Sequence, residues 1–205
     1  HMWTPDVYEG APSPVTGFLA SVSKAAIFVA LLRWFLDSNL FQFEALVKCI
    51  GLIAILSMIA GNLLALQQNN MKRLLAYSSI AHMGYLIIIF IVAGDSLNRS
   101  LATEAAIFYL IAYTFTTLAA FGVLALVTSK QQDRENVEIQ YIAGLMWQRP
   151  LLASLLLVAL LSLAGIPLTA GFIGKFYLLT AAVSGYHWIL VAGLVIGSVI
   201  GIYYY

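Results

Sequence analysis

Residues 164–171 read AGIPLTAG and lie at the centre of an apolar run that extends over residues 150–183. As one helix, this run of about 34 residues would be about 51 Å long, whereas the hydrocarbon core of a bilayer is about 30 Å thick. Proline removes a backbone donor and glycine weakens a helix, so Gly165, Pro167 and Gly171 predict a discontinuous helix of two halves joined by extended backbone. Such breaks occur at membrane depth only where protein buries them or where they line a wet cavity, as at the ion sites of transporters. A simple proline kink is the alternative.

The rest of the chain is equally apolar. Of its 205 residues, 62% are hydrophobic and 9% are charged, whereas a soluble domain has about 45–50% apolar and about 25% charged residues. Uninterrupted runs of this length suit helices, because lipid offers no partner to unpaired backbone groups and a barrel strand is much shorter. The fold class is therefore all-α: a polytopic membrane helix bundle of about six transmembrane helices, forming a single transmembrane domain over residues 1–205. The runs lie at residues 15–36, 46–66, 74–93, 101–127, 150–183 and 188–205.

Charge and cysteine content exclude several classes of function. Ten Lys and Arg against nine Asp and Glu give a net charge of +1, which leaves no electrostatic footprint for nucleic acid. The single cysteine, Cys49, excludes an intrachain disulfide and a thiolate clip for a metal or an iron–sulfur cluster. We find no glycine-rich nucleotide loop. If the protein serves a redox enzyme, the sequence predicts that the electrons travel through another chain.

Three ionisable residues lie deep inside apolar runs, where lipid disfavours them. Lys24 is about halfway along its run, His82 is near the middle of the third run, and Lys175 follows the broken stretch. A lysine at the bilayer centre costs about 2.5–3.5 kcal/mol on insertion scales and is by default a functional residue. We expect the three to act as proton carriers at one membrane depth, among serine and threonine hydroxyls that hold water. The alternatives are a structural ion pair for the lysines and a neutral, hydrogen-bonded histidine between packed helices.

The remaining charges allow simpler explanations. Asp6 and Glu9 stand in a polar stretch rich in proline, where turn chemistry and capping of the next helix account for them. Lys72 and Arg73 are expected to be interfacial anchors that obey the positive-inside rule.

Three stretches together resemble the N subunit of bacterial respiratory complex I, the proton-translocating NADH:quinone oxidoreductase. They are HMWTPDVYEGAPSPV at residues 1–15, which leads to Lys24, NMKRLLAYSSIAHMGY at residues 70–85, and the broken stretch at residues 163–175. The resemblance implies a fold of fourteen helices with two inverted five-helix repeats, of which this chain holds the eighth helix through most of the thirteenth. It also implies that Lys24 and Lys175 match the lysines of a central polar axis.

The chain ends suggest an internal fragment, because residue 1 is a histidine in a polar stretch and residue 205 lies within an apolar run. On the resemblance, the axis glutamate of the fifth helix and the lysine of the seventh helix precede His1. The resemblance further implies a multi-pass location in the bacterial inner membrane and partners among the other membrane subunits of complex I. No cofactor is expected on this chain; flavin, iron–sulfur clusters and quinone are expected on partner subunits.

Three hypotheses follow from the sequence. The first is a non-redox, proton-translocating subunit of NADH:quinone oxidoreductase, driven by redox chemistry in other subunits. The second is a subunit of a cation/proton antiporter that works without electron transfer. The third is a structural spacer in which the buried lysines only fix helix pairing.

Overall fold

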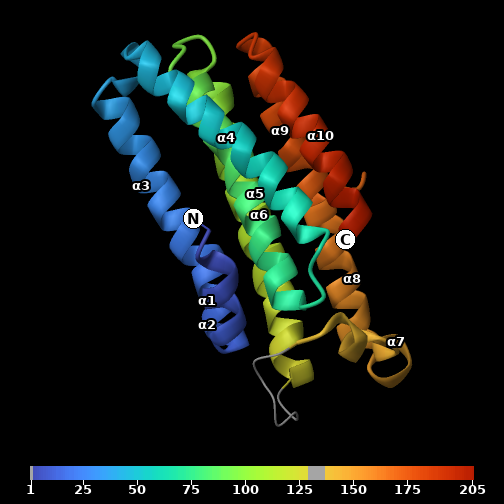
Figure 1. The fold of residues 1–205 in the computed structure, drawn as a ribbon. Coiled ribbons are helices and arrows are strands. Elements are labelled where there is room, and N and C mark those ends of the chain that lie inside the picture. Colours follow the sequence, from blue (N-terminus) through green and yellow to red (C-terminus); the bar gives the residue numbers. More distant parts are fainter. Residues whose placement is uncertain (1, 129–136) are drawn as a thin grey trace.

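The computed structural model describes residues 2–128 and 137–205, and this part of the chain is a bundle of helices (Figure 1). Figure 1 shows α3 on one side and α8, α9 and α10 on the other, with α4, α5 and α6 between them. The helical elements are α1 Thr4–Gly10, α2 Ser13–Phe18, the π-helical η1 Leu19–Ser23, α3 Lys24–Asp37, the 3-10 turn η2 Leu40–Gln42, α4 Glu44–Ala65, α5 Met71–Val92, α6 Arg99–Thr128, the 3-10 turn η3 Ile139–Ile142, α7 Leu145–Gln148, α8 Pro150–Ala164, α9 Ala170–Ser184 and α10 Trp188–Tyr204.

The predicted runs are found as helices with shifts of a few residues at their ends. Within the described residues, four helical segments are long and apolar enough to cross a membrane: Ser13–Asp37, Glu44–Ala65, Met71–Val92 and Arg99–Thr128. The shorter apolar helices α8 and α9 share the fifth run, and α10 occupies the sixth. The prediction of an all-α membrane bundle is therefore confirmed.

Helix α5 is the core of the bundle. In the apolar part of α5, 83% of the residues are buried, whereas in that of α4 only 22% are buried. Helix α5 is therefore surrounded by protein, while α4 keeps a face for lipid. The two helices pack closely because small residues meet their backbones. A Cβ added at Gly84 would lie 2.8 Å from the backbone nitrogen of Met58. The polar groups of α5 are thus held between other helices, away from lipid.

The predicted interruption of the fifth run is present. Helix α8 ends at Ala164 and α9 begins at Ala170, so Gly165 and Pro167 lie in the break and Gly171 is the second residue of α9. Gly165 has φ +82°, a left-handed conformation that ends helices and favours glycine. The amide of Gly165 donates to the carbonyl oxygens of Leu161 and Ser162, which closes the last turn of α8.

The polar stretch before the first run differs from expectation. Residues 4–10 form the short helix α1, which packs on α5 and buries Thr4, Pro5 and Tyr8. Pro5 fits this position because proline is tolerated in the first turn of a helix. The stretch is therefore a structured part of the bundle.

Candidate functional site

Lys175 lies on α9 and turns back toward the break between α8 and α9. Its Nζ donates hydrogen bonds to the carbonyl oxygens of Leu163, at 3.0 Å, and Ala164, at 2.7 Å. These carbonyls belong to the last turn of α8, where the helix interruption leaves them without intrahelical partners and the helix dipole favours a cation. The break thus creates an acceptor site that the lysine amine fills.

Two glycines allow this arrangement. A Cβ at Gly165 would lie 2.8 Å from Cδ and 3.1 Å from Nζ of Lys175, so a side chain there would displace the amine. At Gly171, an added Cβ would overlap the carbonyl oxygen of Ser162. The Gly171 amide donates to the hydroxyl oxygen of Ser162 at 3.1 Å, and Thr169 caps the start of α9 through the Phe172 amide. The two halves of the helix are therefore fixed to each other across the break.

Lys24 is the first residue of α3 and follows the π-helical turn η1 directly. Single π-helical turns within α-helices are frequent at functional sites because they redirect the residues that follow. The Nζ of Lys24 donates to the hydroxyl of Ser79 on α5. Lys24 also lines a cavity of about 220 Å³ together with Thr4 and Tyr8 of α1 and Ser23.

His82 lies on α5, between the regions of the two lysines. Its Nδ1 is joined to the Tyr109 hydroxyl of α6 by a hydrogen bond of 2.6 Å. Since His82 follows Ser79 by three residues, one turn of α5 separates it from the group that binds Lys24.

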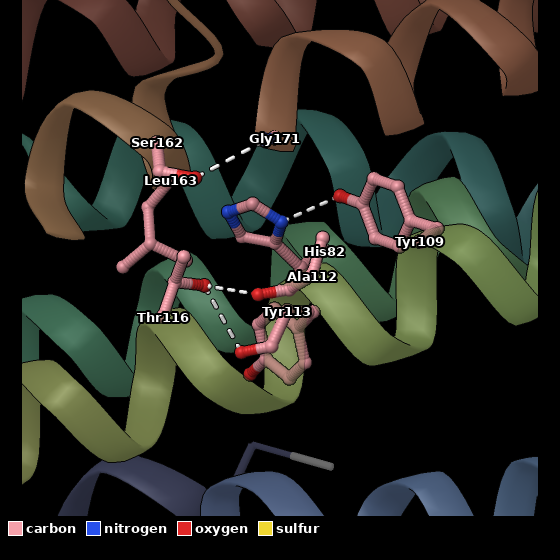
Figure 2. A pocket seen from close by; sticks show the side chains of 8 residues that line it. All are labelled: His82, Tyr109, Ala112, Tyr113, Thr116, Ser162, Leu163 and Gly171. Carbon is pink, nitrogen blue, oxygen red and sulfur yellow. Dashed lines mark hydrogen bonds between the residues drawn. The ribbon is translucent and has the colours of Figure 1, made fainter. Parts of the chain in front are cut away.

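A small cavity joins His82 to the break (Figure 2). Its volume is about 10 Å³, which is about the space that one water molecule needs. Figure 2 shows Ser162, Leu163 and Gly171 of the broken helix on one side of His82, and Tyr109, Tyr113 and Thr116 of α6 on the other. The cavity therefore lies between the imidazole and the carbonyl groups at the end of α8.

The two lysines do not lie on neighbouring helices. η1 packs on α6, while α9 packs on α5 and α6. Ser79 and His82 of α5 and Tyr109 of α6 lie between the regions of the two amines. That the three residues act as proton carriers at one membrane depth stays a prediction.

Burial and pairing distinguish the two lysines from ordinary membrane anchors. Their exposed fractions are 8% for Lys24 and 6% for Lys175, and His82 is 4% exposed. Among residues 2–128 and 137–205, neither lysine has a carboxylate within salt-bridge distance. The structural ion pair considered from the sequence is therefore not found in this part of the chain.

The charges near α1 have a different role from the one expected. Arg73 binds both Asp6, at 2.8 Å, and Glu9, at 2.7 Å, so these carboxylates hold α1 against α5 and do not cap the next helix. Lys72 is fully buried, and its Nζ donates to the carbonyl oxygens of Glu9 and Ala11. The prediction of two interfacial anchors was wrong, because both cations fasten the polar stretch to the bundle.

Two tyrosines belong to the site although the sequence did not predict them. Tyr109 contacts His82, and Tyr113, one turn further along α6, lines the same cavity. Their spacing of four residues within an apolar run predicts one polar stripe on α6 and was the available signal. In the described part of the chain, the buried hydroxyls of Tyr8, Tyr113 and Thr117 have no hydrogen-bond partner.

Comparison with known proteins assigns the chain to a family. The family described as NADH:quinone oxidoreductase/Mrp antiporter, TM, matches residues 1–201. A relative from Methylococcus capsulatus named NADH-quinone oxidoreductase subunit N is 56% identical over all 205 residues, which cover 41% of that protein. The chain thus spans about two fifths of the length of this relative. The resemblance to subunit N is confirmed.

Solved structures place the fold in the same group. A chain of respiratory complex I from Thermus thermophilus with bound aureothin has a TM-score of 0.82 and 38% identity, covering 100% of this chain and 43% of its own. A chain of the Mrp complex from Dietzia sp. has a TM-score of 0.87 at 21% identity, covering 100% of this chain and 36% of its own, and shows a shared fold alone. The chain therefore belongs to the NADH:quinone oxidoreductase/Mrp antiporter transmembrane family.

Proposed function

We propose that this chain is the proton-translocating part of an N-type membrane subunit of NADH:quinone oxidoreductase, with Lys24, His82 and Lys175 as its proton carriers. The observation that carries the proposal is the burial of two lysines that have no carboxylate partner in the described residues. An ionisable side chain inside a membrane-spanning helix marks a proton relay or ion pathway by default, and a fixed opposite charge would keep it ionised. Amines that lack such a charge are free to exist with or without the proton as neighbouring charges change.

The contacts suggest a route for the proton. Lys24 faces the 220 Å³ cavity and binds Ser79 of α5. His82 lies one turn further along α5 and reaches Tyr109 and the small cavity beside Ser162. Lys175 binds the carbonyl groups that flank this cavity. Hydroxyl groups and single water molecules along this line would carry the proton between the amines, because each can both accept and donate it.

The source of energy lies outside this chain in the proposal. In this multi-pass inner-membrane protein, a change of charge or hydration along the axis would drive the proton from Lys24 toward Lys175 and then to the opposite side of the membrane. Flavin, iron–sulfur clusters and quinone would belong to partner subunits, and the other membrane subunits of the complex would deliver the signal. The chain itself makes or breaks no bond in a substrate.

The Mrp-like fold similarity, at 21% identity, adds no separate support for cation exchange. The spacer hypothesis accounts for the hydrogen bonds of Lys175 to Leu163 and Ala164, because an amine that caps an interrupted helix stabilises it. That hypothesis gives no reason for a second, separate lysine at Ser79.

The test uses Lys24→Met and Lys175→Met in the full-length subunit of the assembled enzyme, reconstituted in proteoliposomes. Methionine keeps the apolar stem and removes the proton-binding group. We expect each variant to lower the number of protons pumped per NADH oxidised. An assembled enzyme with unchanged stoichiometry would support the spacer, and Na⁺-dependent exchange without NADH would support the antiporter.

A further inference from the structure

Lys24 and Lys175 each face the ring of a tyrosine. The Nζ of Lys24 lies 5.3 Å from the centroid of the Tyr8 ring, and the Nζ of Lys175 lies 5.4 Å from the centroid of the Tyr85 ring. Both distances fall within the range of about 6 Å in which the negative face of an aromatic ring attracts an ammonium group. The same arrangement thus recurs at two lysines on different helices, with rings supplied by α1 and α5.

The Tyr85 ring is held firmly in this position. It is 1% exposed, and its hydroxyl accepts a hydrogen bond of 3.0 Å from Nδ2 of Asn62 on α4. Nδ2 of Asn62 also donates to the carbonyl oxygen of Met58, at 2.6 Å, and its Oδ1 accepts from the Tyr204 hydroxyl, at 2.9 Å. On the other side, a Cβ added at Gly197 of α10 would lie 2.8 Å from the Tyr85 hydroxyl. Helices α4 and α10 therefore fix the angle at which this ring meets Lys175.

Tyr8 is held in a comparable way. It is 2% exposed and packs edge-on against Phe121 of α6, with ring centroids 5.9 Å apart. Its helix, α1, is fastened to α5 by the ion pairs of Arg73 with Asp6 and Glu9. Neither α1 nor α4 carries one of the proposed proton carriers, yet each fixes a ring that faces one.

We propose that the faces of Tyr85 and Tyr8 are the counter-groups of the Lys175 and Lys24 ammonium forms, with Asn62 as a positioning residue that acts through Tyr85. This inference rests on the proposed function, because it matters only if these amines change charge. A ring face attracts the ammonium form through its quadrupole and offers no site that accepts the proton. A carboxylate would hold the ammonium form permanently, whereas a ring favours it weakly enough to let the proton leave.

The test changes the charge distribution of the ring while nearly keeping its shape. In the full-length subunit of the assembled enzyme, Tyr85 is replaced by phenylalanine and then by mono-, di- and trifluorophenylalanine, since each fluorine withdraws negative charge from the ring face. Tyr85→Phe itself should lower the protons pumped per NADH partly, because it loses the bond to Asn62. From this value we expect the ratio to fall stepwise with each fluorine toward that of Lys175→Met. The same series at Phe90 is the control, because Phe90 also lies on α5 but packs against the rings of Phe28 and Phe35. It is expected to leave the ratio unchanged.

A double-mutant cycle tests the role of Asn62. Asn62→Leu should lower the pumping ratio in the enzyme with Tyr85 and have little further effect when Tyr85 is already phenylalanine, because its hydrogen bond to the ring hydroxyl is then absent. Equal ratios throughout the fluorine series, together with a low ratio for Lys175→Met, would overturn the ring proposal and leave the proposed function intact. An unchanged ratio for Lys175→Met itself would overturn both.

Discussion

The Nδ1 atom of His82 lies 2.6 Å from the hydroxyl oxygen of Tyr109, which joins the central helix α5 to α6 beside the cavity at the helix break. Which atom carries the proton depends on the tautomer of the imidazole. A phenol and an imidazole in contact can exchange donor and acceptor roles, so this pair is suited to a step between the two lysines.

Replacing the histidine tests this step. His82→Ala removes the imidazole, and we expect a lower proton-to-NADH ratio than in the wild type but a smaller loss than in Lys175→Met, because water in the enlarged cavity can partly replace the ring. The measurement is proton pumping per NADH oxidised in proteoliposomes between about pH 6 and 8. Wild-type pumping across this range would remove His82 from the relay.

The tyrosine can be tested separately. Tyr109→Phe keeps the ring and removes only the hydroxyl that contacts His82. We expect a partial loss of pumping, with NADH oxidation by the assembled enzyme retained. Tyr177→Phe on α9 serves as the matched control, since Tyr177 packs against Phe108 and does not line the cavity. Equal behaviour of the two variants would speak against a role for the Tyr109 hydroxyl.

Gly165 serves both the left-handed backbone of the break and the position of the Lys175 amine. Gly165→Ala is expected to destabilise the subunit by about 1–2 kcal/mol, because the left-handed φ of +82° disfavours a side chain. The new methyl group would also displace Lys175, so pumping should fall further than stability explains. Gly122→Ala on α6 is the control, since an added Cβ there meets nothing within 4 Å. A Gly165→Ala enzyme with normal stability and pumping would contradict the account of the break.

The ion pairs of Arg73 predict an effect on stability. Arg73→Gln removes the charge-assisted bonds to Asp6 and Glu9. We expect the free energy of unfolding of the subunit to fall by about 1 kcal/mol and the temperature of thermal inactivation to fall with it. Arg33→Gln removes a highly exposed pair with Asp37 and should change little. The two variants are compared by thermal inactivation of the purified enzyme. If they behave alike, the pairing of α1 with α5 contributes nothing measurable.

The sequence predicted the helices and the break because these follow from local chemistry. Apolar runs fix membrane spans, and the AGIPLTAG stretch removes the hydrogen bonds that a continuous helix needs. Lys24, Lys175 and His82 stood out because charge inside an apolar run is costly. No partner from a distant helix was needed to see any of these features.

The missed features depend on contacts between segments that are far apart in the sequence. From the sequence alone, Arg73 and Lys72 have the pattern of interfacial anchors. Their partners Asp6, Glu9 and the Ala11 carbonyl lie at least 61 residues away and reach them only through the packing of α1 on α5. Tyr109 is an ordinary aromatic residue of an apolar run until His82 is placed beside it. Helix packing decides such pairings, and a single sequence carries little information about it.

The central claim is that Lys175 binds and releases a proton, and the most direct measurement of this claim is the proton-to-NADH ratio of Lys175→Arg in the assembled enzyme. Arginine keeps the positive charge and the hydrogen-bond donors for the carbonyls of Leu163 and Ala164, but it does not lose its proton. Lys72→Arg is the matched control, because Lys72 is also buried and also donates to two carbonyl oxygens. We expect a reduced ratio for Lys175→Arg and a wild-type ratio for Lys72→Arg. A wild-type ratio for Lys175→Arg would show that Lys175 need not release its proton during pumping.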